Sequence, residues 1–156
     1  MVKCNSTSRL PSIDSFVLLT QTDTTVGLLS QDASKLQTIK ARASTKPFIK
    51  VYKNFHTLTK NFRVPNRQKR RVRRAKKTTF IVKNIAFRVA KDSSYSTLLR
   101  KSLWNYSTSA NESGKNFDRE FCEEKADIII ETRVPLHEGN SSALYKINSK
   151  KRVRLR

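Results

Sequence analysis

Stretches with the patterns of strands and of helices alternate along this chain, and that alternation limits the folds open to it. Short apolar or alternating runs predict strands at residues 16–19, 48–52, 78–82, 85–89, 126–131 and 143–147. Amphipathic stretches predict helices at residues 32–42 and 54–62, from Asp92 or Ser93 to Trp104, and at residues 117–125. Chains in which strands and helices take turns form layered sheets. The sequence therefore predicts an α/β (α+β) domain in which helices flank a sheet.

Several local signals refine this outline. Asp32 is a suitable N-cap for the first helix, and the Lys83-Asn84 pair predicts a hairpin turn because Asn tolerates positive φ. The isoleucine run within residues 126–131 is expected to form a buried strand, and residues 20–25, 106–114 and 136–142 are expected to form polar turns or loops. With 156 residues the chain fits one domain. We expect residues 1–15 to be a partly flexible extension and residues 16–156 to be the domain, with a basic segment at 66–77.

The chain carries a large excess of positive charge. It holds 33 Lys and Arg against 12 Asp and Glu, so its formal net charge is +21 at pH 7. A field of this sign raises the local concentration of polyanions. Nucleic acid is the first candidate partner and an anionic membrane surface the second, while a generally basic protein background is an alternative that charge alone leaves open.

The basic segment is the densest part of this charge. Eight of the eleven residues from 67 to 77 are cationic and are candidates for RNA binding: Arg67, Lys69, Arg70, Arg71, Arg73, Arg74, Lys76 and Lys77. The segment contains only Val72 and Ala75 as apolar residues, so it lacks a face that could insert into a membrane. Nucleic acid is therefore the expected partner, and no membrane contact is expected.

Cysteines and histidines are too sparse to build a metal site or a disulfide framework. The chain has two of each, Cys4 and Cys122, and His56 and His137, in no ligand spacing. We therefore expect no protein-bound structural metal. No apolar leader follows Met1 and no run of about 20 apolar residues occurs, so a cytoplasmic location is expected.

Three polar segments could carry chemistry. The first is Gln21–Leu28, the second is Lys40-x-Arg42 followed by Lys46-Pro47, and the third is Ser107–Gly114. Hydroxyls that follow a strand lie where open sheets bind ligands, and two neighbouring cations can converge on one anion. Taken singly, the first and third segments are better explained as plain polar turns or loops, and the two cations as a favourable interaction with the helix C-terminus. Neither a Walker A motif nor a dinucleotide glycine fingerprint is present.

Taken together, the three segments resemble the YrdC-like family in order and spacing. Gln21–Leu28 (QTDTTVGL) resembles the family's P-T-[DE]-T-V-Y-G-L, and residues 40–47 resemble its K-x-R-x-x-x-K-P. Ser107–Gly114 (STSANESG) matches S-T-S-A-N-x-S-G throughout. Weaker likenesses occur at residues 79–81, 86–89, 139–142 and 153–154. The resemblance implies a YrdC-like fold, which is one domain built on a twisted, open, mixed sheet flanked by helices.

The resemblance also implies an activity. The family condenses L-threonine, bicarbonate and ATP, with Mg²⁺ on the triphosphate, into threonylcarbamoyl-adenylate and pyrophosphate, a nucleotidyltransferase reaction. The product serves the t⁶A modification at position 37 of tRNA, which makes a downstream threonylcarbamoyl-transferase complex a further expected partner. The reaction needs positioning and charge neutralisation more than a side-chain nucleophile.

Site residues follow from the same resemblance. ATP is expected to contact Lys40, Arg42, Lys46, Thr79, Ser109, Asn111, Ser141 and Arg154, of which Lys40 and Arg42 are the catalytic candidates. Threonine or its carbamate is expected to contact Thr22, Thr24, Arg88 and Thr108.

The chain departs from the family pattern at three places. Gln21 replaces a proline, Thr25-Val26 replaces a Val-Tyr pair, and Ala75, Lys76 and Lys77 stand where the family has a P-G-P turn. A second interpretation therefore stays open, namely a non-catalytic YrdC-like protein that binds double-stranded RNA or tRNA.

Overall fold

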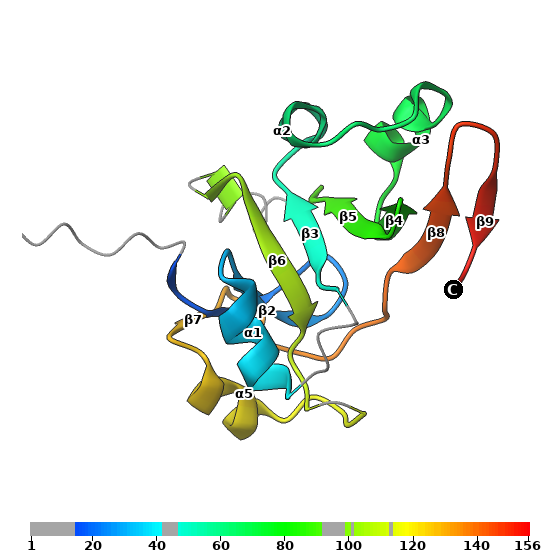
Figure 1. Cartoon of the computed structure of the whole chain (residues 1–156). Helices are drawn as coiled ribbons and strands as arrows, with labels where there is room; N and C mark the ends of the chain where they lie inside the picture. Colours follow the sequence, from blue (N-terminus) through cyan, green and yellow to red (C-terminus); the bar gives the residue numbers. More distant parts are fainter. Residues whose placement is uncertain (1–14, 42–46, 92–98, 101, 113) are drawn as a thin grey trace, which may run out of the picture.

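A nine-stranded sheet organises the molecule (Figure 1). The computed structural model describes residues 15–41, 47–91, 99–100, 102–112 and 114–156. The strands are β1 (Leu18–Gln21), β2 (Val26–Ser30), β3 (Ile49–Tyr52), β4 (Thr78–Val82), β5 (Ile85–Val89), β6 (Trp104–Ser109), β7 (Ile128–Ile130), β8 (Ala143–Ile147) and β9 (Arg152–Arg154). Their order across the sheet is β7-β1-β2-β6-β3-β5-β4-β8-β9.

The sheet is mixed. The pairs β1–β7, β3–β5 and β4–β8 are parallel, and the other five neighbouring pairs are antiparallel. Four helices lie in the described part of the chain: α1 (Ala33–Lys40), α2 (Phe55–Asn61), α3 (Lys69–Arg74) and α5 (Arg119–Lys125). A 3₁₀ turn at Asn66–Gln68 leads into α3. None of these helices has the length and apolar character that a membrane span requires.

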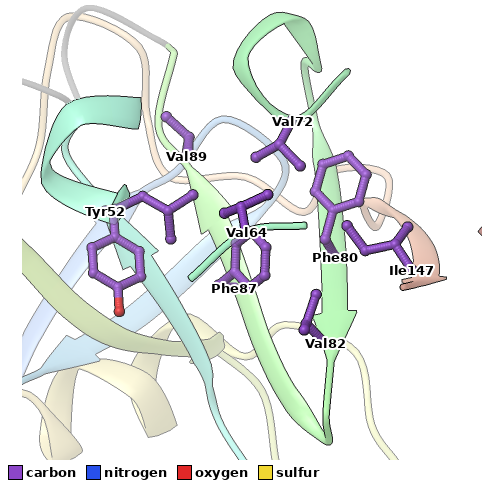
Figure 2. Close-up of a cluster of buried hydrophobic side chains, with 9 residues drawn as sticks. Tyr52, Val64, Val72, Phe80, Val82, Phe87, Val89 and Ile147 are labelled. Atoms are coloured by element: carbon purple, nitrogen blue, oxygen red, sulfur yellow. The ribbon is translucent and has the colours of Figure 1, made fainter. Parts of the chain in front are cut away.

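The helices pack on one face of the sheet, which we call the helix-covered face. In one half, Leu36 of α1 and Cys122 of α5 pack against Leu28 of β2. In the other half, Leu58 of α2 and Val72 of α3 pack against residues of β3, β4, β5 and β8 (Figure 2). The register places these strand residues on one face because cross-strand partners point to the same side.

The opposite face carries the third core cluster and the cavity described below, and we call it the cavity face. Leu18, Leu29, Val51, Ala90 and Leu99 are buried together there. Along each strand they alternate with the residues under the helices, as the period of two requires.

Several expected elements are present with closely similar bounds. Asp32 caps α1, since its carboxylate accepts hydrogen bonds from the backbone N–H groups of Ser34 and Lys35. The β4–β5 hairpin turns at Lys83 and Asn84, which both have positive φ, as the Asn predicted. The expected single domain with a mixed sheet flanked by helices is thereby confirmed.

Two strands were expected to be something else. The polar segment Gln21–Leu28 fits a turn by its sequence, but its residues 26–28 begin β2. Trp104 is expected to end a helix and residues 106–109 to lie in a loop, but they belong to β6. Both strands lie inside the sheet and are paired on both sides, so ladder hydrogen bonds stabilise them despite their hydroxyl-rich sequences.

The strand expected to be buried at residues 126–131 lies at an edge. Only Ile128–Ile130 form β7, which pairs with β1 alone, and Ile129 is 43% exposed. An isoleucine run predicts a strand but does not tell which sheet position it takes. The start of the helix expected from Asp92 or Ser93, and the extension expected at residues 1–15 except for its last residue, lie outside the described residues.

Candidate functional site

A cavity of about 540 Å³ opens on the cavity face, where the three polar segments meet. Gly27 of β2, Ile49 of β3 and Arg88 of β5 contribute its sheet wall. Ile81 of β4, Ala86 of β5 and Leu144 of β8 add to this wall. The remaining lining residues come from the first polar segment, the end of α1, the residues before β3, the end of β6 and the loop after it, the loop before β8 and the C-terminus: Thr22, Thr24, Thr25, Lys40, Pro47, Ser107, Thr108, Ser109, Gly114, Ser141, Ser142 and Arg156.

At one side of the cavity, Lys40 joins the end of α1 to the end of β6. Its side-chain ammonium donates to the backbone oxygens of Ser109 (3.0 Å) and Asn111, and to the Asn111 Oδ1 (2.9 Å). The Ser109 hydroxyl donates to the same Oδ1 at 2.6 Å. Lys40 is only 7% exposed. The lysine of K-x-R and the Ser and Asn of S-x-N therefore form one cluster, although about 70 residues separate them in the sequence.

On the sheet wall, Arg88 is a buried cation with unfilled hydrogen-bonding capacity. It is 4% exposed; one guanidinium nitrogen donates to the Thr24 hydroxyl (3.0 Å), and another lies 3.4 Å from Asp23 Oδ1. Its Nε and both carboxylate oxygens of Asp23 have no hydrogen-bond partner in the described part of the chain. Buried charges are costly unless hydrogen-bonded, so a cavity-facing guanidinium in this state is suited to receiving an anionic ligand group.

The first polar segment folds as a tight turn that presents threonine hydroxyls to the cavity. The Thr22 hydroxyl donates to the Thr25 backbone oxygen (2.6 Å) and lies 3.3 Å from the hydroxyl of Thr24. The turn therefore fixes the Thr24 hydroxyl at the position where Arg88 reaches it.

The loop before β8 crosses over this turn at very close range. Gly139 donates its backbone N–H to the Thr25 hydroxyl (3.1 Å), and His137 donates to the Gln21 side-chain oxygen (3.0 Å). A Cβ on Gly139 would lie 2.1 Å from the Thr24 backbone oxygen, so a side chain there requires a backbone movement. Gln21, which replaces the family's proline, thus ties the turn to this loop.

The structure brings most of the expected site residues together. Seven of them line the cavity: Thr22, Thr24, Lys40, Arg88, Thr108, Ser109 and Ser141. Thr79 and Asn111 lie behind it. Thr79 is fully buried and its hydroxyl shares a 2.8 Å hydrogen bond with that of Ser142, whereas Asn111 positions Lys40. Arg42 and Lys46 lie outside the described residues.

Arg154 is the expected residue that the structure does not bring to the cavity. It pairs with Tyr145 across β8 and β9, which places it on the helix-covered face. Arg156 lines the cavity instead, and its Nε donates to the Ser142 backbone oxygen (3.1 Å). The sequence could not decide between the two arginines because β9 is only three residues long and its register depends on β8.

The remaining candidates are the metal-ligating side chains, the buried thiol and the basic segment. In the described part of the chain, no three His, Cys, Asp or Glu side chains gather where they could hold a metal ion. Cys122 of α5 is fully buried in the core, and this burial raises the pKa of its thiol. The cationic side chains of the 66–77 segment are exposed on and after α3, and none of them lines the cavity.

Comparison with known proteins resolves the fold. No protein-family description matches the sequence, and no curated protein is similar to it. Among solved structures, a double variant of P. abyssi Sua5 matches with a TM-score of 0.76 and 17% identity, over 91% of this chain and 52% of Sua5. The fold is YrdC-like.

Two further structures with this YrdC-like fold support the assignment. P. abyssi Sua5 complexed with L-threonine matches with a TM-score of 0.71 and 18% identity, over 91% of this chain and 50% of Sua5. E. coli YciO matches with a TM-score of 0.73 and 16% identity, over 93% of this chain and 84% of YciO. The chain thus spans about half the length of the Sua5 structures, and at these identities the likeness is one of fold.

Proposed function

We propose that this chain is an L-threonylcarbamoyladenylate synthase, which condenses L-threonine, bicarbonate and ATP. The observation that carries the proposal is the cluster in which the Lys40 ammonium binds Ser109 and Asn111, at the edge of a cavity that also contains Arg88. The cavity volume of about 540 Å³ is within the usual range for small-molecule sites. The YrdC-like fold of Sua5, one structure of which holds L-threonine, supports the same substrate.

The sheet wall is suited to threonine. The Arg88 fork would bind the carboxylate of the amino acid, because guanidinium and carboxylate pair with two parallel hydrogen bonds. Thr22, Thr24 and Thr108 line the cavity, and the hydroxyls of Thr22 and Thr24 would orient the amine and the side chain. Asp23 forms a buried ion pair with Arg88, at 3.4 Å, and is a positioning residue in this arrangement.

The side of the cavity near α1 and the C-terminus is suited to the nucleotide. The threonine amine takes up bicarbonate with loss of water, and an oxygen of the resulting carbamate then attacks the α-phosphorus of ATP. The bond between the α-phosphorus and the bridging oxygen breaks, and pyrophosphate leaves with its Mg²⁺. Lys40 and Arg156 would neutralise charge on the phosphates, and the hydroxyls of Ser109 and Ser141 would bind them.

Pyrophosphate release tests the proposal directly. Purified protein is mixed with ATP, Mg²⁺, bicarbonate and threonine, and release is compared with a mixture that lacks threonine. Release that requires threonine supports the synthase, and release at the background rate contradicts it.

A matched pair of variants assigns the activity to the cavity. Lys40→Met should lower threonine-dependent release by about 10²-fold or more, because it removes a charge placed at the phosphates. Threonine affinity should change little, since Arg88 and the threonines stay in place. Lys35→Met removes the same charge from the exposed side of the same helix and should keep full activity. Equal activity in the two variants would contradict the assignment.

The alternative is a YrdC-like protein that binds RNA without catalysis. The exposed arginines of α3, which lie away from the cavity, favour it. Absence of threonine-dependent pyrophosphate release, together with salt-sensitive binding of tRNA, is the result expected from that alternative.

A further inference from the structure

A second hollow lies on the helix-covered face, between α3 and the β8–β9 hairpin. Its volume is about 470 Å³, and five arginines line it, together with Ala75, Thr78, Phe80 and Tyr145. The five are Arg67, Arg70, Arg71, Arg74 and Arg152, and we call this site the arginine groove. It shares no residue with the cavity. Phe80 and Tyr145 reach the groove, while their neighbours Ile81 and Leu144 line the cavity, so the two sites lie on opposite sides of β4 and β8.

The sequence places four of these arginines on one side of the 66–74 segment. Arg67, Arg70, Arg71 and Arg74 have the i, i+3, i+4, i+7 spacing, which aligns side chains along one helical face. Val72 points the other way and is buried in the core with Phe80 and Val64 (Figure 2). Burial of Val72 therefore fixes which side of the helix the arginines occupy.

Buried polar contacts hold the two walls of the groove together. Gln68 is 5% exposed; its side-chain nitrogen donates to the Asn148 backbone oxygen (3.2 Å), and its oxygen accepts from Arg71 (3.2 Å). Asn148 in turn accepts hydrogen bonds from the backbone N–H groups of Lys150 and Lys151, both at 2.8 Å, within the β8–β9 turn. One glutamine thus links α3 to the hairpin that carries Arg152.

No acidic side chain from the groove-forming segments offsets this charge. The sequence contains no Asp or Glu between residues 33 and 91 or between residues 139 and 156, and every groove residue comes from these two stretches. None of the four ion pairs in the described part of the chain involves a groove arginine. Mutual repulsion among the arginines is then relieved best by an anionic ligand that spans several of them.

We propose that the arginine groove binds the phosphodiester backbone of RNA without regard to base sequence. Guanidinium groups pair with phosphate oxygens through two parallel hydrogen bonds, and several successive phosphates match several successive arginines. An acidic protein partner is less well matched, because protein interfaces centre on exposed aromatic or apolar anchors. In the groove, Phe80 is buried and the Tyr145 ring lies under the Arg152 guanidinium, 4.7 Å from its centre. The choice of RNA over DNA rests on the proposed function. The prediction that the groove binds phosphate groups rests on its arginines alone and holds whether or not the chain is a synthase.

Salt dependence of RNA binding tests the groove. The double variant Arg70→Ala/Arg74→Ala is compared with Lys60→Ala/Arg63→Ala, which removes the same charge from exposed positions outside both the basic segment and the groove. The affinity for a short fluorescent RNA duplex is measured by anisotropy between 50 and 200 mM salt. Each phosphate contact contributes about 0.9 to the slope of log affinity against log salt, so the groove variant should lose about 1.8 from the slope. The control variant should keep a slope close to that of the unchanged protein. Equal slopes for the two variants would overturn the proposal.

Three further measurements keep the result interpretable. Arg152→Gln changes the opposite wall, and it should also lower the slope, by about 0.9. A fluorescent polyglutamate peptide is the competing anion: binding as tight as that of RNA, with the same loss in the groove variant, would assign the groove to acidic proteins and overturn the RNA proposal. Circular dichroism melting confirms that the exposed substitutions leave the fold intact.

The experiment also separates this proposal from the synthase. Threonine-dependent pyrophosphate release should be unchanged in Arg70→Ala/Arg74→Ala, because neither residue lines the cavity. Failure of the release assay in every protein would refute the synthase and leave the salt slopes as an independent test of the groove.

Discussion

Gly139 offers a sharp test of how the cavity is built. The loop before β8 crosses the Thr22–Thr25 turn so closely that an added Cβ would lie 2.1 Å from the Thr24 backbone oxygen, whereas real Cβ contacts stay above 3.0 Å. The backbone of Gly139 does not have positive φ, so Gly139→Ala introduces a steric overlap without torsional strain. The substitution therefore measures the close approach alone.

The size of the effect follows from this overlap. One of the two backbones must move by about 0.9 Å merely to reach the 3.0 Å limit, and further to restore an ordinary van der Waals contact. The Thr24 hydroxyl accepts a 3.0 Å hydrogen bond from the Arg88 guanidinium, and a movement of that size would break the contact. Misplacement of a binding group by about 1 Å can cost ~10²-fold in activity. Overpacking of this kind costs about 1–3 kcal/mol of stability, or a fall of about 2–12 °C in melting temperature for a domain of this size.

Calorimetric titration with threonine measures the loss of threonine affinity, and thermal melting measures the loss of stability. Glu138→Ala changes the neighbouring exposed residue and should leave both values at those of the unchanged protein. If Gly139→Ala matches that control in melting temperature and in threonine affinity, the two segments do not pack as described. The melting measurement remains informative even if the protein does not bind threonine.

Two other consequences can be checked in parallel. Arg88→Lys should weaken threonine binding by about 10–100-fold, because an ammonium loses the two-pronged pairing with a carboxylate, while ATP affinity measured by the same titration should stay near its original value; unchanged threonine affinity would refute the role of Arg88. The Cys122 thiol should react with iodoacetamide only when the protein unfolds, because burial raises its pKa and so lowers its thiolate fraction at pH 8. In a Cys4→Ser variant Cys122 is the remaining cysteine, so the mass increase measured by mass spectrometry reports alkylation of this thiol alone. Rapid alkylation without denaturant would show that the thiol is accessible and would contradict the prediction.

The sequence predicted more of the cavity than of the strands that frame it. Residues that resemble K-x-R and S-x-N could be recognised as string matches, and Lys40, Ser109 and Asn111 do meet. Helix α1 was also predictable, since Asp32 is a local capping signal. By contrast, β2 and β6 owe their conformation to neighbours on both sides, and no pattern within Val26–Ser30 or Trp104–Ser109 reveals those neighbours.

Register and long-range contacts account for the rest. Arg156 lines the cavity and Arg154 does not, because of the register in which β9 pairs with β8. A three-residue strand does not encode that register by itself. The basic segment was evident from charge, but a groove requires Arg152 from the far end of the chain. The Gln68–Asn148 hydrogen bond that brings the two together joins residues 80 positions apart.

The alternation of side chains along β4 and β8 gives this protein two surfaces that can change separately in evolution. Positions 80 and 145 belong to one surface, and positions 81 and 144 belong to the other. A single substitution in either strand therefore alters one side and leaves the chemistry of the other in place. Lineages of this fold could acquire or lose a polyanion-binding surface while retaining the pocket, or lose the pocket while retaining the surface, without rebuilding the sheet between them.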